Sequence, residues 1–162
     1  MSCQADSKIT WTPKFFTEEE AKSLTAALDV LIPATDTPGA IDAGVPEFID
    51  LLAADLLEAE EKQQFKDGIA QMDADSQAKF GKLFVQASRE QQTELLVGYD
   101  NATFGTDTSN KNEFFENLKN TAVWAFCTSE KGATQHLQYE LNPGGYTNCV
   151  PIAEVGGKTW AI

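Results

Sequence analysis

Apolar residues recur at intervals of three and four along most of the chain, the spacing that places side chains on one face of a helix. The first stripe runs from Leu24 to Ile32; Thr17 and Glu20 precede it at capping-box spacing, and Pro33 ends it. Later stripes predict further helices or helical turns at residues 46–56, 65–72, 80–84, 88–99, 114–126 and 128–136. No alternating pattern is long enough to build a sheet, so we expect an all-α fold.

The stretches without this periodicity define the ends and the loops. Residues 1–13 are polar and predict an irregular tail, and residues 33–40 and 100–112 carry the turn-forming residues of loops. Proline and glycine recur through residues 143–157, which predicts an irregular, extended segment. We therefore expect one compact multi-helix domain over residues 14–162, with an irregular N-terminal tail and a Pro/Gly-rich C-terminal segment.

Length and charge narrow the classes of function. A chain of 162 residues can bury roughly 70% of its unfolded surface and needs no metal or disulfide for a core. The net charge of −13 argues against a nucleic-acid partner and against docking of a basic face on anionic lipid. No apolar run is long enough to span a membrane. We therefore expect this chain to associate with a membrane only through a lipid anchor.

Sequence motifs for chemistry are absent. The chain has no dinucleotide-binding, phosphate-binding or nucleophile-elbow motif, and its single histidine, His136, has no ligand or nucleophile at a useful spacing. Asp73 and Asp75 begin a stretch resembling a calcium loop, but the required glycine and final glutamate are missing, so we read both as solvated or helix-capping. We expect no catalytic, cofactor-binding or metal site in this chain.

Most aromatic residues have helical spacing and are expected in the core. Trp11 and Trp160 lie in irregular terminal segments, where an aromatic side chain is typical of a binding anchor. This favours a docking role.

Three cysteines have different contexts. Cys3 follows a small residue and precedes a polar tether, as in a bacterial lipoprotein after cleavage; the alternative is an ordinary thiol in the tail. On the first reading, the natural precursor carries an upstream signal segment, and Met1 is an added initiator. Cys127 lies on an apolar stripe and Cys149 in a loop; in an oxidising compartment they can bond to each other, or Cys149 can bond to a partner chain.

Two stretches go beyond generic patterns. Residues 28–40 read Leu-Asp-Val-Leu-Ile-Pro-Ala-Thr-Asp-Thr-Pro-Gly-Ala and residues 43–50 read Ala-Gly-Val-Pro-Glu-Phe-Ile-Asp. Later come Phe114-Phe115, then Thr-Ser-Glu-Lys-Gly at 128–132 and Leu-Asn-Pro-Gly-Gly-Tyr at 141–146. Together they resemble the gluconate 2-dehydrogenase subunit 3 family over about residues 14–150.

This resemblance implies a small, non-catalytic subunit of a bacterial dehydrogenase complex. The implied partner is a large FAD-binding oxidoreductase of the glucose-methanol-choline type that oxidises a sugar or sugar acid, with a cytochrome c subunit as a further partner. Small subunits of this family typically stabilise the flavoprotein and escort it to the periplasm on an export signal, often of the twin-arginine kind. The resemblance favours Cys3 as a lipid anchor and places FAD in the partner.

Family-like positions without an evident core role are the candidate interface. They are Pro33, Thr35, Asp36, Tyr139, Tyr146 and Cys149. The competing interpretation is that Pro33 and the nearby glycines shape a turn and that Asp36 forms an Asx turn or a cap. The alternative function is a free-standing periplasmic lipoprotein that binds a small ligand in an inter-helix pocket, and an enzyme using His136 is the weakest hypothesis.

Overall fold

The computed structural model describes residues 9–107, 109–139, 144–145 and 149–160. Helices account for its regular structure, and the described residues contain one isolated bridge, Gln138–Trp160, and no strand, which confirms the all-α prediction. The α-helices are α1 (Glu18–Leu31), α2 (Val45–Asp55), α3 (Ala59–Phe80), α4 (Arg89–Phe104) and α5 (Glu113–Thr128). Short 3₁₀ turns, η1 (Phe84–Gln86) and η3 (Ile152–Val155), and a π turn, η2 (Gly132–His136), complete the order.

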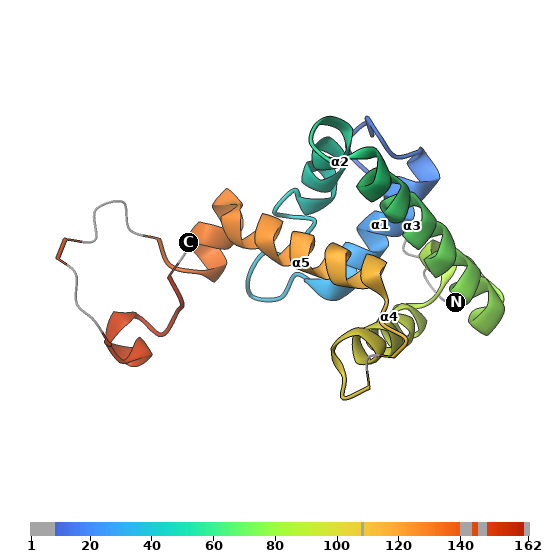
Figure 1. Cartoon of the computed structure of the whole chain (residues 1–162). Helices are drawn as coiled ribbons and strands as arrows, with labels where there is room; N and C mark the ends of the chain where they lie inside the picture. The colour runs from blue at the N-terminus through green and yellow to red at the C-terminus, as the bar shows by residue number, and fades with distance from the viewer. Residues whose placement is uncertain (1–8, 108, 140–143, 146–148, 161–162) are drawn as a thin grey trace.

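Helix α1 is the central element of the bundle, with α2, α3 and α4 packed around it (Figure 1). The Thr17–Glu20 capping box is present, as predicted, and the helix ends at Leu31 just before Pro33. Leu24 and Leu28 are fully buried together with small residues of the same helix, and small side chains let neighbouring helices approach closely.

Helix α5 lies across α2, α3 and α4 and closes the bundle (Figure 1). At its start, the Phe114 ring lies directly over Gly68 in α3, where an added Cβ would overlap the ring. Gly68 therefore sets the distance between α3 and α5 at this crossing. The Phe114 ring also meets Phe65 edge to face, with ring centroids 6.1 Å apart.

A buried carboxylate ties the segment before α1 to α2. Asp50 accepts hydrogen bonds from the backbone N–H groups of Lys14 at 2.6 Å, Phe15 at 3.1 Å and Phe16 at 2.9 Å. Earlier in the chain, Trp11 is half-buried against the core, so our expectation of an exposed anchor there was wrong. Cys3 lies outside the described residues.

Two sequence-predicted boundaries were wrong. The predicted loop at 100–112 is shorter, because α4 continues to Phe104 and buried Thr103 donates its hydroxyl to the Tyr99 carbonyl one turn earlier. The predicted short helix at 80–84 is the end of α3 followed by η1, because Gly81 adopts a left-handed conformation (φ 73°) and ends α3.

Asp73 is a half-buried structural acceptor that joins three elements, so the expectation of a solvated or capping role was wrong. Its carboxylate accepts from the Ser23 hydroxyl at 3.1 Å and from the Phe84 backbone N–H at 3.0 Å, joining α1, α3 and η1. Burial raises the pKa of Asp73, and the two hydrogen bonds offset part of that increase. Asp75 accepts from the Tyr99 hydroxyl at 2.6 Å and likewise belongs to the packing of α3 against α4.

Beyond α5 the chain leaves the bundle. Gly132 is buried against the end of α5, where an added Cβ would overlap the Phe126 carbonyl oxygen, and this fixes the direction of η2. We call residues 137–160 the C-terminal arm, and those of them that the structure describes lie to one side of the bundle (Figure 1). The two ends of the arm meet where the Gln138 N–H donates to the Thr159 carbonyl at 2.9 Å. None of the arm residues that the structure describes belongs to the hydrophobic core.

Candidate partner interface

The loop between α1 and α2 combines an inner, structural part with an outer, exposed part. On the inside, Gly39 is buried where a Cβ would overlap the backbone of Ala34, and the Ala40 N–H donates to the Ile32 carbonyl at 2.8 Å. The Gly39 N–H donates to the Asp42 carboxylate at 3.0 Å. These contacts explain why this loop has a distinctive sequence even without a partner.

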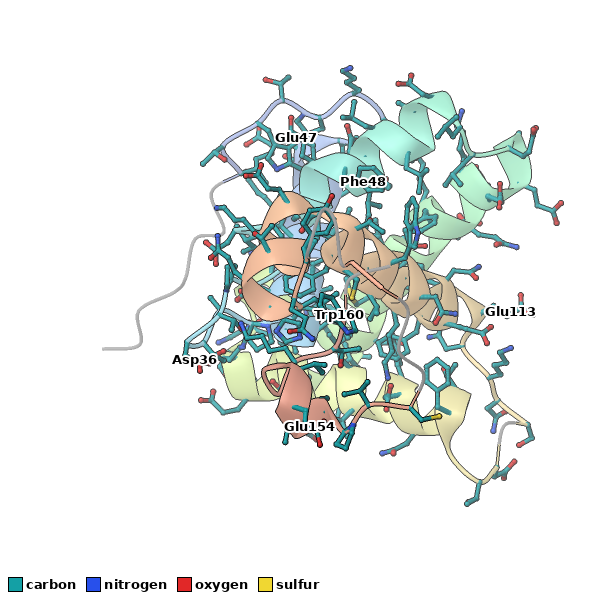
Figure 2. The ribbon with its side chains drawn as sticks, turned by 90° about the vertical axis from the view of Figure 1, so that its left-hand side faces the viewer. Asp36, Glu47, Phe48, Glu113, Glu154 and Trp160 are labelled. Atoms are coloured by element: carbon teal, nitrogen blue, oxygen red, sulfur yellow. The ribbon has the colours of Figure 1, made fainter. Side chains whose placement is uncertain are left out.

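Three candidate interface residues lie on the outer part of that loop. Pro33, Thr35 and Asp36 are all exposed. The Thr35 hydroxyl donates to the Asp36 carboxylate at 3.0 Å, and the Thr35 N–H donates to the Thr37 carbonyl at 3.0 Å. The loop tip is thus shaped by its own hydrogen bonds, while Figure 2 shows Asp36 on the periphery of the molecule. Their role at an interface stays a prediction.

The remaining candidates lie in or beside the arm. Tyr139 is 59% exposed at the base of the arm, and Cys149 is an exposed free thiol. Cys149 has a positive φ of 54°, which is uncommon for a non-glycine residue. Tyr146 lies outside the described residues. Among the described residues, the hydrogen bonds of the arm include those that join Gln138 to Thr159 and Lys158 to Gln135, whereas those of the 33–36 loop tip lie within the loop.

The composition of the arm gives it a low free-energy cost of desolvation when a partner covers it. Residues 141–153 contain no charged side chain in a chain whose net charge is −13. Ile152 and Trp160 are exposed large apolar side chains within the arm, and the prediction that Trp160 lies outside the core is confirmed. Uncharged segments with exposed aromatic and aliphatic side chains are typical of interface centres.

The structure reveals two further aromatic residues that the sequence analysis assigned to the core. Phe48 in α2 and Trp124 in α5 are 38% and 49% exposed, so the core assignment was wrong for both. Their rings contact each other on the surface, with centroids 5.5 Å apart. The sequence did carry one signal for this surface, because residues 120–129 lack any charged side chain.

The titratable groups with raised pKa values belong to the packing of the bundle. Burial and the hydrogen bond to Asp75 raise the pKa of the Tyr99 phenol, and Asp73 is shared between Ser23 and Phe84 as described above. His136 is exposed at the base of the arm, and its ring lies edge to face with Phe126 at 5.4 Å. Among the described residues, no group of three His, Cys, Asp or Glu side chains could hold a metal ion.

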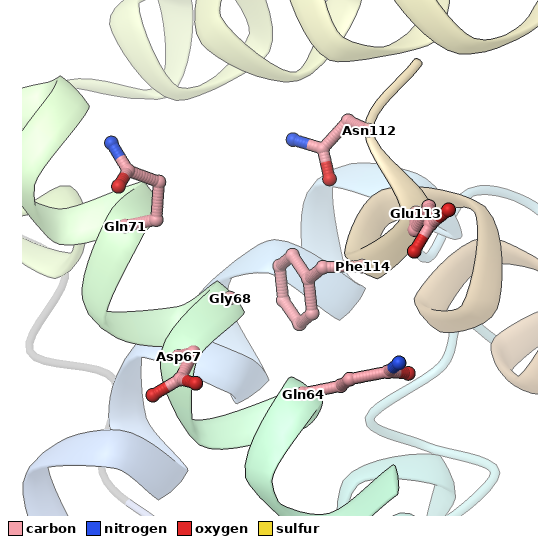
Figure 3. Close-up of a pocket in the computed structure, with 7 residues that line it drawn as sticks. All are labelled: Gln64, Asp67, Gly68, Gln71, Asn112, Glu113 and Phe114. Atoms are coloured by element: carbon pink, nitrogen blue, oxygen red, sulfur yellow. The ribbon is translucent and has the colours of Figure 1, made fainter. Parts of the chain in front are cut away.

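A shallow groove of about 320 Å³ lies between α3 and the start of α5 (Figure 3). Part of its polar lining is engaged in the fold: the Gln71 amide donates to Asp75 at 2.7 Å, and the Asn112 side chain accepts from the Phe115 N–H at 2.9 Å. The Phe114 ring lies over Gly68 at its centre. The groove therefore offers a ligand few free polar groups.

Among the described helices, none is both long enough and apolar enough to cross a membrane.

The described residues form a compact helical bundle from which a C-terminal segment projects, with large apolar side chains exposed on both. Residues 18–144 match the family model described as gluconate 2-dehydrogenase subunit 3, and the chain belongs to that family. The family indicates an accessory subunit of a dehydrogenase complex that associates with the other subunits. Searches of curated proteins and of solved structures found no match.

Proposed function

We propose that this chain is the non-catalytic small subunit of a periplasmic FAD-dependent sugar or sugar-acid dehydrogenase. The observation that carries the proposal is the C-terminal arm, which projects from the bundle and contributes none of its described residues to the core. The exposed apolar side chains of Ile152 and Trp160 are explained if the arm packs against another protein. Membership of the subunit 3 family supplies the complex to which that protein belongs.

The proposed partner is a large FAD-binding subunit of the glucose-methanol-choline type, which holds the flavin and oxidises the substrate. This chain stabilises that subunit and escorts it for export, and a cytochrome c subunit takes the electrons onward. The proposed contacts are Pro33, Thr35, Asp36, Tyr139, Tyr146 and Cys149. Cys3 is the proposed site of a lipid anchor.

The test is co-expression of this chain with a large FAD-binding oxidoreductase of the glucose-methanol-choline type from the same genome, followed by purification through a tag on this chain. We expect a roughly 1:1 complex that shows the absorption spectrum of a flavin, whereas this chain expressed alone is colourless. A colourless monomer, with the large chain soluble in the flow-through, would contradict the proposal.

A second experiment addresses Cys149 alone. If the exposed thiol bonds to the large subunit, the complex migrates as one band on a non-reducing gel, and Cys149→Ser separates the two chains. Cys127 is the matched control, because it is half-buried against the core and its replacement by serine should leave the band unchanged. Identical migration of the wild-type and Cys149→Ser complexes would exclude the inter-chain bond and leave the accessory-subunit role intact.

A further inference from the structure

The surface formed by Phe48 and Trp124 needs an explanation that the fold itself does not give. The two rings lie on neighbouring helices and contact each other, yet both remain substantially exposed. The cores of these helices are made by other faces: Ile49 and Ala53 are fully buried in α2, and Ala122 is fully buried in α5. The bundle is therefore closed beneath the ring pair.

The surroundings of the ring pair are unusual for so acidic a chain. Residues 120–129 carry no charge. Asn120, Val123 and Thr128 are exposed and lie, like Trp124, between the middle of α5 and its C-terminal end. On the α5 side of the ring pair a partner buries no carboxylate, whereas on the α2 side the exposed Glu47, which neighbours Phe48, has to keep its contact with solvent or meet a polar group of the partner. The chemistry thus fits an apolar protein surface and does not fit a charged ligand.

The ring pair also lies close to the base of the C-terminal arm. Helix α5 leads from Trp124 to η2, which begins at Gly132. The four residues from Trp124 to the end of α5 at Thr128 span roughly 6 Å at a rise of about 1.5 Å per residue. Near that end, the His136 ring at the base of the arm meets the Phe126 ring, with centroids 5.4 Å apart. Figure 2, which views the molecule from the side toward which the arm projects, shows Phe48 and Trp160 on that side. A protein that holds the arm can therefore also reach the ring pair.

We infer that Phe48 and Trp124 form a second docking contact for the large flavoprotein subunit, covered by an apolar patch of that subunit. This inference rests on the proposed function and adds a specific surface to it. Trp and other aromatic residues are enriched among the few interface residues that dominate binding energy. Because the rings already pack on each other, little side-chain freedom is lost when the partner covers them.

The test compares the affinity of variants for the purified large subunit. Trp124→Ala and Phe48→Ala should each weaken the complex at least tenfold in Kd, measured by biolayer interferometry with this chain immobilised. Phe104→Ala is the matched control: Phe104 is 47% exposed, but it lies at the end of α4, away from the arm (Figure 1). Its replacement should leave Kd within twofold of the wild-type value.

The outcomes separate this inference from the proposed function. If the wild-type chain binds the flavoprotein but both Trp124→Ala and Phe48→Ala bind equally well, the second contact is refuted and the accessory-subunit role stands. If Phe104→Ala weakens binding as much as the other two variants, the effect is not specific to this surface and the inference also fails. If the wild-type chain does not bind, the proposed function fails and this inference fails with it. Thermal unfolding of each variant alone confirms that it is folded.

Discussion

Asp50 holds the segment before α1 against α2, and replacing it should destabilise the fold without touching the proposed interface. The carboxylate is 1% exposed and accepts three backbone hydrogen bonds: one oxygen takes the Lys14 N–H, and the other takes those of Phe15 and Phe16. Asp50 lies within the family-like stretch 43–50, so a stability role and a binding role have to be separated.

The expected magnitude follows from the number of bonds lost. A hydrogen bond to a charged group contributes about 1.5–3 kcal/mol. Asp50→Asn keeps one oxygen for Phe15 and Phe16 but turns an amide N–H toward the Lys14 N–H, so we expect a loss of about 2–3 kcal/mol. At about 2–4 °C per kcal/mol, Tm should fall by about 4–12 °C. Asp50→Ala removes all three bonds and should cost about 4–5 kcal/mol.

The assay is urea unfolding followed by circular dichroism, with Asp55→Asn as the control. Asp55 is the exposed last residue of α2, and its replacement should change the free energy of unfolding by less than about 0.5 kcal/mol. At a temperature where Asp50→Asn remains folded, it should bind the large subunit as the wild type does. Equal stabilities of Asp50→Asn and Asp55→Asn would refute the reasoning, and lost binding by a fully folded variant would place Asp50 at the interface.

Three further predictions test other parts of the account. Gly68→Ala should lower the free energy of unfolding by about 1–2 kcal/mol in chemical denaturation, because its Cβ would overlap the Phe114 ring. The control Gly98→Ala, an exposed helical position with open space around it, should raise that free energy by about 0.5–1 kcal/mol, and a loss at both sites would contradict the packing argument. Burial raises the pKa of Asp73 above its ordinary value of 3.8, so the ionised carboxylate destabilises the fold at neutral pH. This destabilisation decreases as the pH falls through the folded-state pKa toward 3.8, because the carboxylate becomes protonated in the folded protein. The free energy of unfolding of Asp73→Asn, relative to wild type, should therefore be higher at pH 7 than near pH 4, and a difference independent of pH would refute this. His136→Ala should leave the dehydrogenase activity of the assembled complex nearly unchanged, whereas total loss with normal assembly would support a catalytic role.

The helix pattern and its caps could be predicted because they depend on local sequence. Thr17 with Glu20 forms the capping box that its spacing indicated, and Ser88 with Gln91 forms another with the same spacing at the start of α4. The end of α4 could not be predicted from the polar composition of 100–112, because Thr103 is buried and donates its hydroxyl within the helix. Local composition does not report burial, which depends on how α4 and α5 meet.

The candidate surface was only partly predictable for the same reason. Helical spacing indicates that Phe48 and Trp124 share a face with other apolar residues, but it does not say whether that face meets the bundle or solvent. Asp73 shows the converse case, because a carboxylate predicted to be solvated lies between α1, α3 and η1 and accepts two hydrogen bonds there. Whether each of these side chains is buried or exposed depends on how distant segments of the chain pack against one another.

The central claim is that the C-terminal arm attaches this chain to a flavoprotein. The most direct measurement is purification of the complex through a tag at the N-terminus of this chain, with either the full sequence or a version ending at His136. Because no described arm residue lies in the core, the shortened chain should unfold at nearly the wild-type temperature. We predict that the full chain carries the large subunit and its flavin spectrum, and that the shortened chain, although folded, carries neither. Recovery of the same amount of flavin with the shortened chain would contradict the account.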